Sequence, residues 1–424
     1  MKKLLSQAYN NPLLKGSFIV LVSTNITNVL SYLFQYLMLR LLTPDEYRIL
    51  FALFSLFAIV GVFGGTMAQV GVKFSAELKA KEDFRLLTGL FKKLTIYNLL
   101  VALLIVSAFF VFGSNISTLL NIPVIFLHTF SLFIAASMVL GLPTTMLNGL
   151  LRFKSFGFVT IITGVFKLVI PIFIFYLGFG LVVIIWGLIF GAVLSSSLAT
   201  YFLKKNLRRN LTEFSSSKIF KMAIPMFFIS IFTILLFNID VLLVNKFFDI
   251  QSAATYSSVA LIGRIILYGA GAITVIVLPV VTEKFTKGHK LQKTLFLSTL
   301  LVVVMGMAGV LILYLFPDLI NTYVFGGKYP DSVPFLWSFG VFMVLYALVG
   351  MLTSFFIGIN KFYVSWVLLL GGLFQIIGIT LFHSTLWQVI IVNIISMSTI
   401  LLLYLLMLVN FFKNIKVSEV INAD

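Results

Sequence analysis

The sequence contains no cysteine and very little charge. Three of its 424 residues are histidine, and 10% are Asp, Glu, Lys or Arg. The absence of cysteine excludes disulfide bonds and thiolate metal ligands. His128, His289 and His383 are far apart in the chain, so a histidine-based metal centre is not expected. A soluble domain carries about 25% charged residues, so this composition is not that of a water-soluble protein.

Apolar residues, by contrast, make up 61% of the chain, and the mean hydropathy is +1.14. No soluble fold hides that much apolar surface, so lipid is the expected surrounding. Runs long enough to cross about 30 Å of hydrocarbon cover residues 16–39, 49–72, 94–113, 123–150, 157–177, 180–203, 219–245, 253–282, 294–316, 333–358, 362–382 and 386–412. The first run is longer than a signal-peptide core and lacks a cleavage pattern. We therefore predict an all-α integral membrane protein with twelve transmembrane helices.

Lysine and arginine are distributed unevenly between the connecting segments. With the N-terminus inside, the outer segments hold Arg40, Arg48, Lys246 and Lys328. The remaining basic residues, apart from Lys167 and Arg264, lie in the cytoplasmic segments. Positive residues are enriched on the cytoplasmic side of membrane proteins. Both termini are therefore expected in the cytoplasm, with the plasma or inner membrane as the location. The basic residues behind the net charge of +17 lie in short segments between apolar runs, where they indicate membrane orientation. A nucleic-acid partner, which such a charge would suggest in a soluble protein, is therefore not expected.

The two halves of the sequence resemble each other at an offset of 209 residues. At this offset Gly141, Gly149, Arg152 and Phe153 fall on Gly350, Gly358, Lys361 and Phe362, and Tyr47 falls on Tyr256. Glycine and phenylalanine are common here, so chance is the alternative to a common origin. Six helices per half give both halves the same orientation, which predicts a parallel repeat with lobes 1–210 and 211–424. Two such lobes with a cleft between them suit transport by alternating access.

Three ionisable residues lie inside the predicted helices, where a charge costs at least about 2.5–3.5 kcal/mol. Arg264 lies near the midplane with Tyr268 on its face; it either grips an anionic group in a central cavity or forms a structural ion pair with Asp240. Lys167 lies at a similar depth and has the same two interpretations. Asp240 suits proton or cation coupling, or pairing with a cavity cation; the alternative is an interfacial residue near the headgroups.

Polar stripes mark two other predicted helices. The first helix carries Asn25, Asn28, Tyr32 and Gln35 on one face, which either lines the cavity or hydrogen-bonds to neighbouring helices. The second carries Thr66, Gln69, Lys73 and Glu77, leading toward the cytoplasmic mouth. Lys73 and Glu77 are also spaced for a simple interfacial ion pair. We expect helix interruptions at these places: Gly64–Gly65, Gly141 with Pro143, Pro171, Gly269 and Gly271, Pro279, and Gly371–Gly372. They would act as hinges that let the lobes bend; close packing of helices is the alternative for the glycines.

The segment from Leu39 to Tyr47, Leu-Arg-Leu-Leu-Thr-Pro-Asp-Glu-Tyr, resembles the Arg-x-Leu-x-Pro-x-x-Tyr-Gly signature of the oligosaccharide/polysaccharide flippases. That family belongs to the multidrug/oligosaccharidyl-lipid/polysaccharide exporter superfamily. Other short matches, namely Asn148-Gly149-x-x-Arg152, Asn238-x-Asp240, Tyr256 and Pro279, are similar to the same family. The resemblance covers essentially the whole chain. Arg48 stands where the family usually has glycine, so it alters packing, gating or an anion path.

This resemblance implies a flippase that moves polyprenyl-(pyro)phosphate-linked oligosaccharide to the outer leaflet. We expect substrate contacts from the following residues: Arg264, Lys167, Asn25, Asn28, Gln35, Tyr268 and Arg48. Coupling or gating is assigned to Asp240, Arg40 and Lys73. No cofactor is expected beyond a coupling ion, H⁺ or Na⁺. The expected partners are the lipid-linked substrate, membrane lipids and polysaccharide-assembly enzymes.

Three alternatives stay open from the residues themselves. One is a non-transporting membrane scaffold, which would leave the midplane charges without a purpose. A multidrug or cation-coupled exporter would need several cavity carboxylates, whereas Asp240 is the acidic residue we place within a helix. A membrane glycosyltransferase or polymerase would need catalytic carboxylates in a sizeable external loop, and the outer loops hold only Asp45, Glu46, Asp249, Asp318 and Asp331. The charge balance thus favours a transporter of an anionic substrate over an enzyme.

Overall fold

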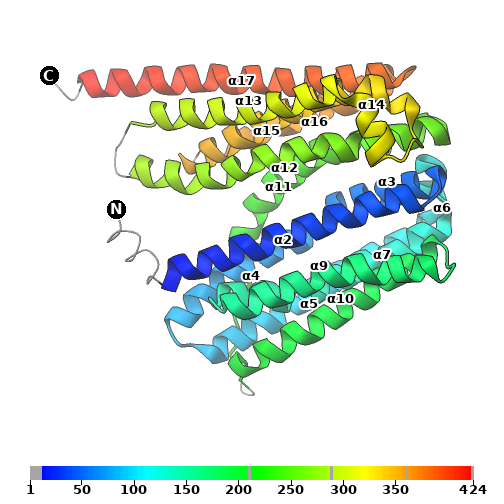
Figure 1. The fold of residues 1–424 in the computed structure, drawn as a ribbon. Coiled ribbons are helices and arrows are strands. Elements are labelled where there is room, and N and C mark those ends of the chain that lie inside the picture. Colours follow the sequence, from blue (N-terminus) through cyan, green and yellow to red (C-terminus); the bar gives the residue numbers. More distant parts are fainter. Residues whose placement is uncertain (1–11, 209–211, 287–289, 360, 422–424) are drawn as a thin grey trace. The chain divides into compact units, whose positions relative to one another are not determined.

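Helices are the regular elements throughout the part of the chain that the structure describes. The computed structural model describes residues 12–208, 212–286, 290–359 and 361–421. Contacts between helices divide it into two compact units, Met1–Ser230 and Ile231–Asp424, called the N-terminal and C-terminal units below. Figure 1 shows the helices of each unit. The predicted all-α fold class is confirmed.

The N-terminal unit is built from six of the predicted membrane segments. Its helices are α2 (Pro12–Leu41), α3 (Pro44–Val60), α4 (Val62–Ala80), α5 (Phe84–Val111), α6 (Gly113–Leu120), α7 (Val124–Leu140), α8 (Leu142–Gly149), α9 (Phe153–Tyr176) and α10 (Leu181–Leu203), followed by the short 3₁₀-helix η1 (Lys204–Asn206). α9 packs along both α2 and α10, and α7 contacts α5 and α10. Gly157 and Gly164 bring α9 close to α2, because a β-carbon at either would crowd Ser23 or Thr27.

The C-terminal unit contains the other six segments. They are α11 (Ser216–Phe247), α12 (Ile250–Thr286), α13 (Gln292–Leu315), α15 (Leu336–Gly358), α16 (Val364–Leu381) and α17 (Leu386–Ile421). Between α13 and α15 lie the short helices α14 (Pro317–Leu319), η2 (Ile320–Val324, a π-helix) and η3 (Pro330–Phe335). α15 packs most extensively against α12 and also contacts α13 and α17. Most of its residues are buried, so α15 is the central helix of this unit.

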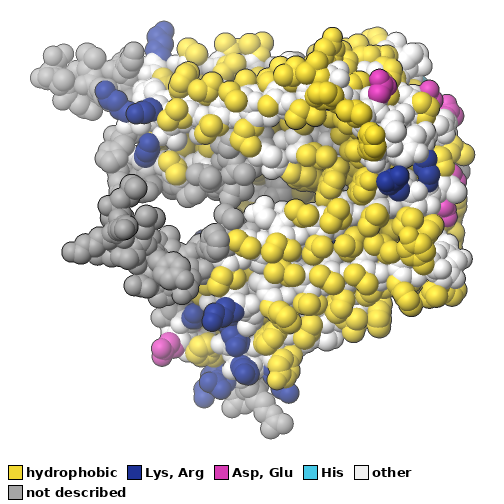
Figure 2. Space-filling model, in the orientation of Figure 1, with side chains coloured by type: hydrophobic (Ala, Val, Ile, Leu, Met, Phe, Trp, Pro, Cys, Tyr) yellow, Lys and Arg dark blue, Asp and Glu magenta, His cyan; other side chains and the backbone are white. Residues whose placement is uncertain are grey.

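The membrane-spanning character follows from length and surface. Ten helical segments among the described residues are long and apolar enough to cross a membrane, and the bent pair α3–α4 adds one more. α2, with 30 residues, completes the predicted twelve. Large apolar side chains such as Leu104 and Leu381 are about 70% exposed, and Figure 2 shows hydrophobic side chains along the visible flanks of both units. Such a surface requires lipid around it, so the protein is a multi-pass membrane protein.

Two of the membrane segments are broken near a glycine. α3 and α4 meet at Gly61 with a bend of 49°. α7 ends and α8 begins at Gly141, with Pro143 in the first turn of α8. Proline has no N–H to bridge the break, which explains the second site. The expected interruption at Gly141 is confirmed, whereas the one expected at Gly64–Gly65 lies slightly earlier in the chain, at Gly61. The interruptions expected elsewhere are wrong, because the helices α9, α12 and α16 run without a break through Pro171, Gly269, Gly271, Pro279 and Gly371–Gly372.

The two compact units divide within α11, at Ser230–Ile231, and the predicted lobe boundary at residues 210–211 stays a prediction. The polar segment after α10 folds back onto the N-terminal unit. Phe214 is buried there, with its ring 5.0 Å from that of Phe74. Ile219 and Ala223, at the start of α11, join the same apolar core. Because these side chains are buried there, the N-terminal unit extends into α11. The polar composition of residues 204–218 does not reveal this burial.

The internal repeat is matched at helix ends. Gly149 is the last residue of α8, and Gly358 is the last residue of α15. Tyr47 and Tyr256 lie near the starts of α3 and α12, and both are fully buried. These pairs lie at equivalent points of the two halves, whereas Gly141 lies at a helix break and its counterpart Gly350 lies within the continuous helix α15.

Candidate functional site

A buried polar cluster in the C-terminal unit surrounds Asp240. Asp240 lies on α11 and is completely buried. Its Oδ2 accepts a hydrogen bond of 2.6 Å from the Tyr256 hydroxyl on α12 and a longer one of 3.4 Å from Asn393 Nδ2 on α17. Asn393 Nδ2 also donates to the Tyr256 hydroxyl oxygen at 2.9 Å. Gln375 Nε2 on α16 donates to Asn393 Oδ1 at 2.8 Å, so four helices meet at one carboxyl group.

This cluster has acceptor capacity left over. Asp240 Oδ1 and Gln375 Oε1 are both buried and have no hydrogen-bond donor among the described residues. A buried acceptor without a donor costs about 1–3 kcal/mol, and more for a charged group. Oxygen atoms arranged in this way suit a small cation or a proton. Asp240 is completely buried, which argues against the alternative that it is an interfacial residue near the lipid headgroups.

Arg264 lies on α12 and points at α11 of the same unit. Its Nη2 donates to the backbone oxygen of Phe237 at 3.1 Å and to Asn238 Oδ1 at 3.4 Å. The guanidinium carbon lies 4.3 Å from the centre of the Phe237 ring. Asp240 accepts hydrogen bonds from Tyr256 and Asn393. These hydrogen-bond partners differ from those of Arg264, which are Phe237 and Asn238. Tyr268, one turn further along α12, is 59% exposed.

Lys167 lies on α9 of the N-terminal unit, beside two aromatic rings. Its Nζ is 5.6 Å from the centre of the Phe34 ring on α2 and 5.1 Å from that of Phe54 on α3. None of the ion pairs between described residues involves Lys167. Phe54 in turn contacts Phe130 and Phe133 on α7. The ammonium group is thus held at the edge of an aromatic cluster by cation–π attraction, which is worth about 0.5–2 kcal/mol.

The predicted polar face of α2 lies on its exposed side. Asn25 and Asn28 are exposed, whereas Thr27, next to them, hydrogen-bonds to the backbone oxygen of Thr160 on α9 at 3.0 Å. Gln35 is partly buried, and its Oε1 has no donor among the described residues. Exposed amides at membrane depth favour hydrated surroundings over lipid. The helix α2, which carries Asn25, Asn28 and Gln35, packs against α9. Lys167 lies on α9.

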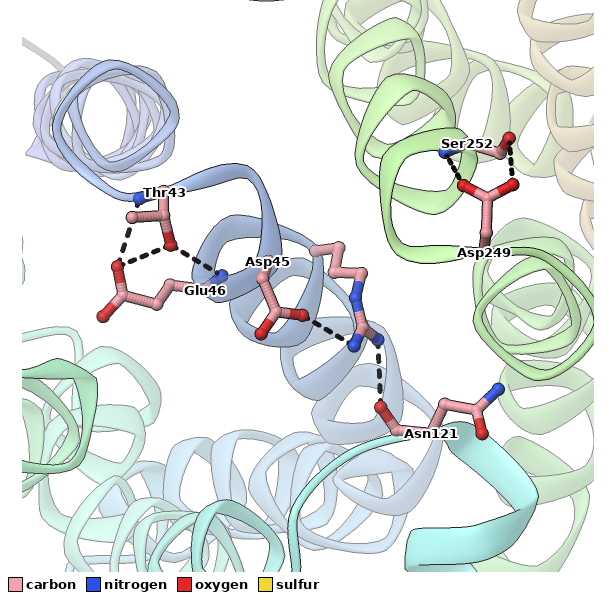
Figure 3. A network of polar contacts seen from close by, with 7 residues as sticks. Thr43, Asp45, Glu46, Asn121, Asp249 and Ser252 are labelled. Carbon is pink, nitrogen blue, oxygen red and sulfur yellow. Dashed lines mark hydrogen bonds and ion pairs between the residues drawn. The ribbon is translucent and has the colours of Figure 1, made fainter.

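Arg48 is part of a separate network at the start of α3, and Figure 3 shows its partners Asp45 and Asn121. It is 5% exposed, pairs with Asp45 at 2.6 Å and donates to the backbone oxygen of Asn121 at 3.0 Å. Thr43 and Glu46 form a capping box at the start of the same helix. Arg48 therefore ties the start of α3 to the turn after α6, which is a packing role.

Figure 3 also shows Asp249 at the start of α12. The backbone N–H of Ser252 donates to the Asp249 carboxylate at 2.8 Å, and the Ser252 hydroxyl donates to it at 3.0 Å. These hydrogen bonds favour the ionised form and lower the pKa of Asp249. Asp249 therefore caps the start of α12.

The remaining predicted site residues lie apart from these groups. Arg40 is exposed in the last turn of α2 and donates to the Tyr36 hydroxyl at 3.3 Å. Lys73 is exposed on α4, with its Nζ 5.9 Å from the centre of the Phe74 ring. The structure does not bring Arg40 or Lys73 together with Lys167.

Sequence reasoning missed Asn393 and Gln375. Each is a strongly polar residue inside a predicted apolar run, 386–412 and 362–382. An amide at membrane depth must find hydrogen-bond partners, and this signal could have marked both residues. Their meeting with Asp240 could not be read from spacing, because the three residues lie on different helices.

The fold is found in solved structures of membrane transporters. The inward-facing conformation of a multidrug resistance MATE family transporter of the MOP superfamily has a TM-score of 0.78 at 15% identity, over 92% of this chain and 96% of that chain. The outward-facing conformation of such a transporter has a TM-score of 0.66 at 16% identity, over 95% and 97%. A MOP superfamily transporter from Pyrococcus furiosus has a TM-score of 0.63 at 16% identity, over 94% and 96%. No curated protein matches the chain.

These similarities show that the chain has the fold of these transporters, a MATE-like fold. The sequence model of the polysaccharide biosynthesis protein family matches residues 37–334, and the chain belongs to that family. The match covers α3 to α13 completely. The resemblance seen in the sequence is confirmed at the level of the family.

Proposed function

We propose that this protein is a flippase that moves polyprenyl-(pyro)phosphate-linked oligosaccharide from the cytoplasmic to the outer leaflet by alternating access. The observation that carries the proposal is Lys167, whose ammonium group contacts aromatic rings but takes part in none of the ion pairs between described residues. A cation kept at membrane depth without a fixed counter-ion is costly. It is retained where an anionic ligand supplies the missing charge.

Arg264 is the second cation assigned to the headgroup. Its hydrogen bonds to the backbone oxygen of Phe237 and to Asn238 Oδ1 orient the guanidinium. Arginine suits phosphate because its planar fork donates two parallel hydrogen bonds. We assign phosphate contact to Lys167 in the N-terminal unit and to Arg264 in the C-terminal unit. The exposed amides Asn25 and Asn28 are assigned to the glycan.

Coupling is assigned to the Asp240 cluster. Asp240 Oδ1 and Gln375 Oε1 lack donors among the described residues, so a proton or Na⁺ bound there would satisfy them. The hydrogen bonds from Tyr256 and Asn393 join α11, α12 and α17 at this carboxyl group. Occupation of the site would therefore change how these helices hold together, which is how a coupling ion can drive a transporter.

The alternatives are less well supported by these groups. An exporter of organic cations needs accessible carboxylates, whereas Asp240 is completely buried and hydrogen-bonded. For the Pyrococcus furiosus transporter of the same fold, the reverse polarity of its binding pocket suggests a different function, so the fold is compatible with pockets of differing charge. The outer acids Asp45 and Asp249 are used in an ion pair and a helix cap, which leaves neither for glycosyl transfer, and no enzymatic activity is proposed.

The proposed setting is the cytoplasmic membrane with both termini inside. The lipid-linked substrate and membrane lipids are the proposed partners, together with polysaccharide-assembly enzymes that produce and consume the substrate.

The test is flipping of a fluorescent polyprenyl-pyrophosphate oligosaccharide in proteoliposomes under imposed H⁺ or Na⁺ gradients. Lys167→Met and Arg264→Met should each lower the rate about 10- to 150-fold, the worth of one charged hydrogen bond of about 1.5–3 kcal/mol. Lys154→Met and Arg85→Met remove exposed cytoplasmic cations and serve as matched controls. Asp240→Asn should abolish the response to the coupling gradient.

No transport by the wild-type protein across several glycans and both gradients would reject the flippase. Transport that survives both Lys167→Met and Arg264→Met would reject these two cations as headgroup ligands.

A further inference from the structure

Two membrane segments of the N-terminal unit are broken beside the same cavity. The first segment, α3–α4, bends by 49° at Gly61, and the second, α7–α8, breaks at Gly141. The cavity has a volume of about 270 Å³, and its lining comes from α3–α4, α5 and α7–α8. Gly61 and Gly141 are both part of that lining. The two breaks therefore lie close together, on the walls of one empty space.

The bend of α3–α4 depends on glycine at position 61. A β-carbon at Gly61 would lie 2.6 Å from the backbone oxygen of Phe57, and real β-carbons essentially never approach closer than 3.0 Å. Phe57 lies one turn earlier in the same segment, so the bent backbone itself causes this overlap. A regular α-helix accommodates a β-carbon at every position, and alanine is the best helix former. Alanine at position 61 should therefore favour a straighter segment.

The break of α7–α8 depends on proline. Pro143 lies in the first turn of α8 and has no N–H to donate to the backbone oxygen of Val139. The end of α7 is held from the side by α5, because Asn98 Nδ2 donates to the backbone oxygen of Met138 at 2.9 Å. This hydrogen bond fixes α7 and does not involve α8. The helix free to change its direction at this break is therefore α8.

The helices that follow the two breaks, α4 and α8, are packed tightly against each other. A β-carbon at Gly149 on α8 would lie 2.9 Å from the α-carbon of Val72 and 2.8 Å from the β-carbon of Ser75, both on α4. Gly71 on α4 in turn faces α8, because a β-carbon there would lie 3.6 Å from a methyl carbon of Leu142. Helices that pack through glycine approach to backbone distance. A displacement of α8 would therefore carry α4 with it.

The cavity distinguishes a hinge from a pair of rigid kinks. Protein interiors contain few voids larger than a water molecule, because atoms that line a void lose dispersion contacts. Gly65 lines this cavity, and a β-carbon there would meet nothing within 4 Å. A rigid kink would be more stable with that space filled by a side chain. A bending segment, by contrast, needs free space beside the point at which it bends.

We propose that α3–α4 and α7–α8 form one paired hinge, in which α4 and α8 swing together about Gly61 and Gly141 and the cavity provides the room. The bending of the two segments is then a single equilibrium within the N-terminal unit. A substitution at one break changes the angle at the other. This motion goes beyond the proposed flippase activity, and it occurs without substrate.

The test measures a distance across the first segment. The chain has no cysteine, so spin labels can be attached to Thr43→Cys and Glu77→Cys, which replace two exposed residues on either side of Gly61. Pulsed EPR of the full chain in lipid nanodiscs then gives the distance between the labels. At 1.5 Å per residue, straightening the bend lengthens this distance by about 5 Å. Gly61→Ala should produce that lengthening, and both labels are present in every sample.

The coupling is tested by substitutions in the second segment. Pro143→Ala restores the missing N–H of α8 and should lengthen the distance between the labels on the first segment by at least half as much as Gly61→Ala. Gly141→Ala should act in the same direction, because its β-carbon would lie 2.9 Å from the backbone oxygen of Ser137. Pro171→Ala is the matched control, since Pro171 is buried within the unbroken helix α9 of the same unit. It should leave the distance unchanged.

The role of the cavity is tested by filling it. Gly65→Leu combined with Pro143→Ala should keep the wild-type distance, whereas Gly65→Ala combined with Pro143→Ala should lengthen it as Pro143→Ala alone does. Lengthening by Gly61→Ala without any effect of Pro143→Ala or Gly141→Ala would show two independent kinks and overturn the proposal. No effect of Gly61→Ala, an equal effect of Pro171→Ala, or full lengthening despite Gly65→Leu would also overturn it. Because no substrate is added, failure of the flippase proposal would leave this result unaffected.

Discussion

Single polar residues inside apolar helices carry most of the functional information in this chain. Asp240, Arg264 and Lys167 were identifiable from the sequence because a charge in hydrocarbon demands a reason. Their partners were not, since Asn393 lies 153 residues from Asp240 in the chain and reaches it only through folding. The aromatic setting of Lys167 likewise comes from three separate helices.

Removal of one hydroxyl tests how strongly the Asp240 cluster holds its helices. The Tyr256–Asp240 distance of 2.6 Å is typical of a charge-assisted O–H···O⁻ bond. Tyr256→Phe should therefore cost about 1.5–3 kcal/mol and lower Tm in detergent. The matched control is Tyr404→Phe, which is equally buried but shares its hydroxyl with Thr353 at 3.2 Å. Its cost should be about 0.5–1.5 kcal/mol, and an equal or larger loss there would contradict a charged Asp240.

Asp249 provides a pH-dependent contribution to stability outside the membrane. Hydrogen bonds from Ser252 lower the pKa of Asp249, so its stabilising effect is complete above the usual carboxyl pKa of about 3.9. It is lost as the pH falls through and below that value. Asp249→Ala should cost about 0.5–2 kcal/mol at neutral pH, as expected for a helix cap. Thermal unfolding should show a Tm gap at pH 7 that narrows below about pH 4; a gap independent of pH would refute the role of the charge.

At the scale of elements, two features are not visible in the pattern of apolar runs. They are the helix breaks and the packing of the segment after α10 against α5. The run 123–150 is continuous in sequence, yet it divides into α7 and α8 at Gly141. The segment after α10 is polar, yet it is fixed to α5 by hydrogen bonds from Arg208 N to Thr88 Oγ1 and from Thr212 N to Arg85 O. Lys93 adds an ion pair to Glu213 at 3.6 Å. A polar composition alone does not distinguish this docked segment from a free linker.

Gly89 tests whether the connection is held to α5. A β-carbon at Gly89 would overlap the backbone oxygen of Thr212, so Gly89→Ala must displace this segment. Trypsin should then cleave after Lys204, Lys205 or Arg208 faster than in the wild type, because the docked segment must open before cleavage. Gly350→Ala, with open space at its β-carbon, is the control and should cleave at the wild-type rate. Identical cleavage of Gly89→Ala and wild type would show that the segment is not docked.

At the scale of the whole molecule, orientation in the membrane is the property that charge distribution predicts. The absence of cysteine allows single-cysteine variants to be made without removing others. Ser114, at the start of α6, and Ser217, at the start of α11, are both exposed. The positive-inside rule places Ser114 outside and Ser217 in the cytoplasm.

A membrane-impermeant maleimide should label Ser114→Cys in intact cells. It should label Ser217→Cys only after the membrane is opened. The reverse pattern would invert the proposed topology and, with it, the assignment of the cytoplasmic side.

The sequence by itself determined the membrane segments, the family and the embedded charges, and it predicts the orientation. These properties follow from local composition, because hydrocarbon selects apolar runs and the cytoplasmic side selects positive loops. Tertiary structure alone decided which residues meet Asp240 and where the units divide within α11. It also decided that Arg48 contacts Asp45 and Asn121, and that a pocket lies beside the breaks at Gly61 and Gly141. Each of these depends on contacts between helices distant in the chain, which the period of one helix does not encode.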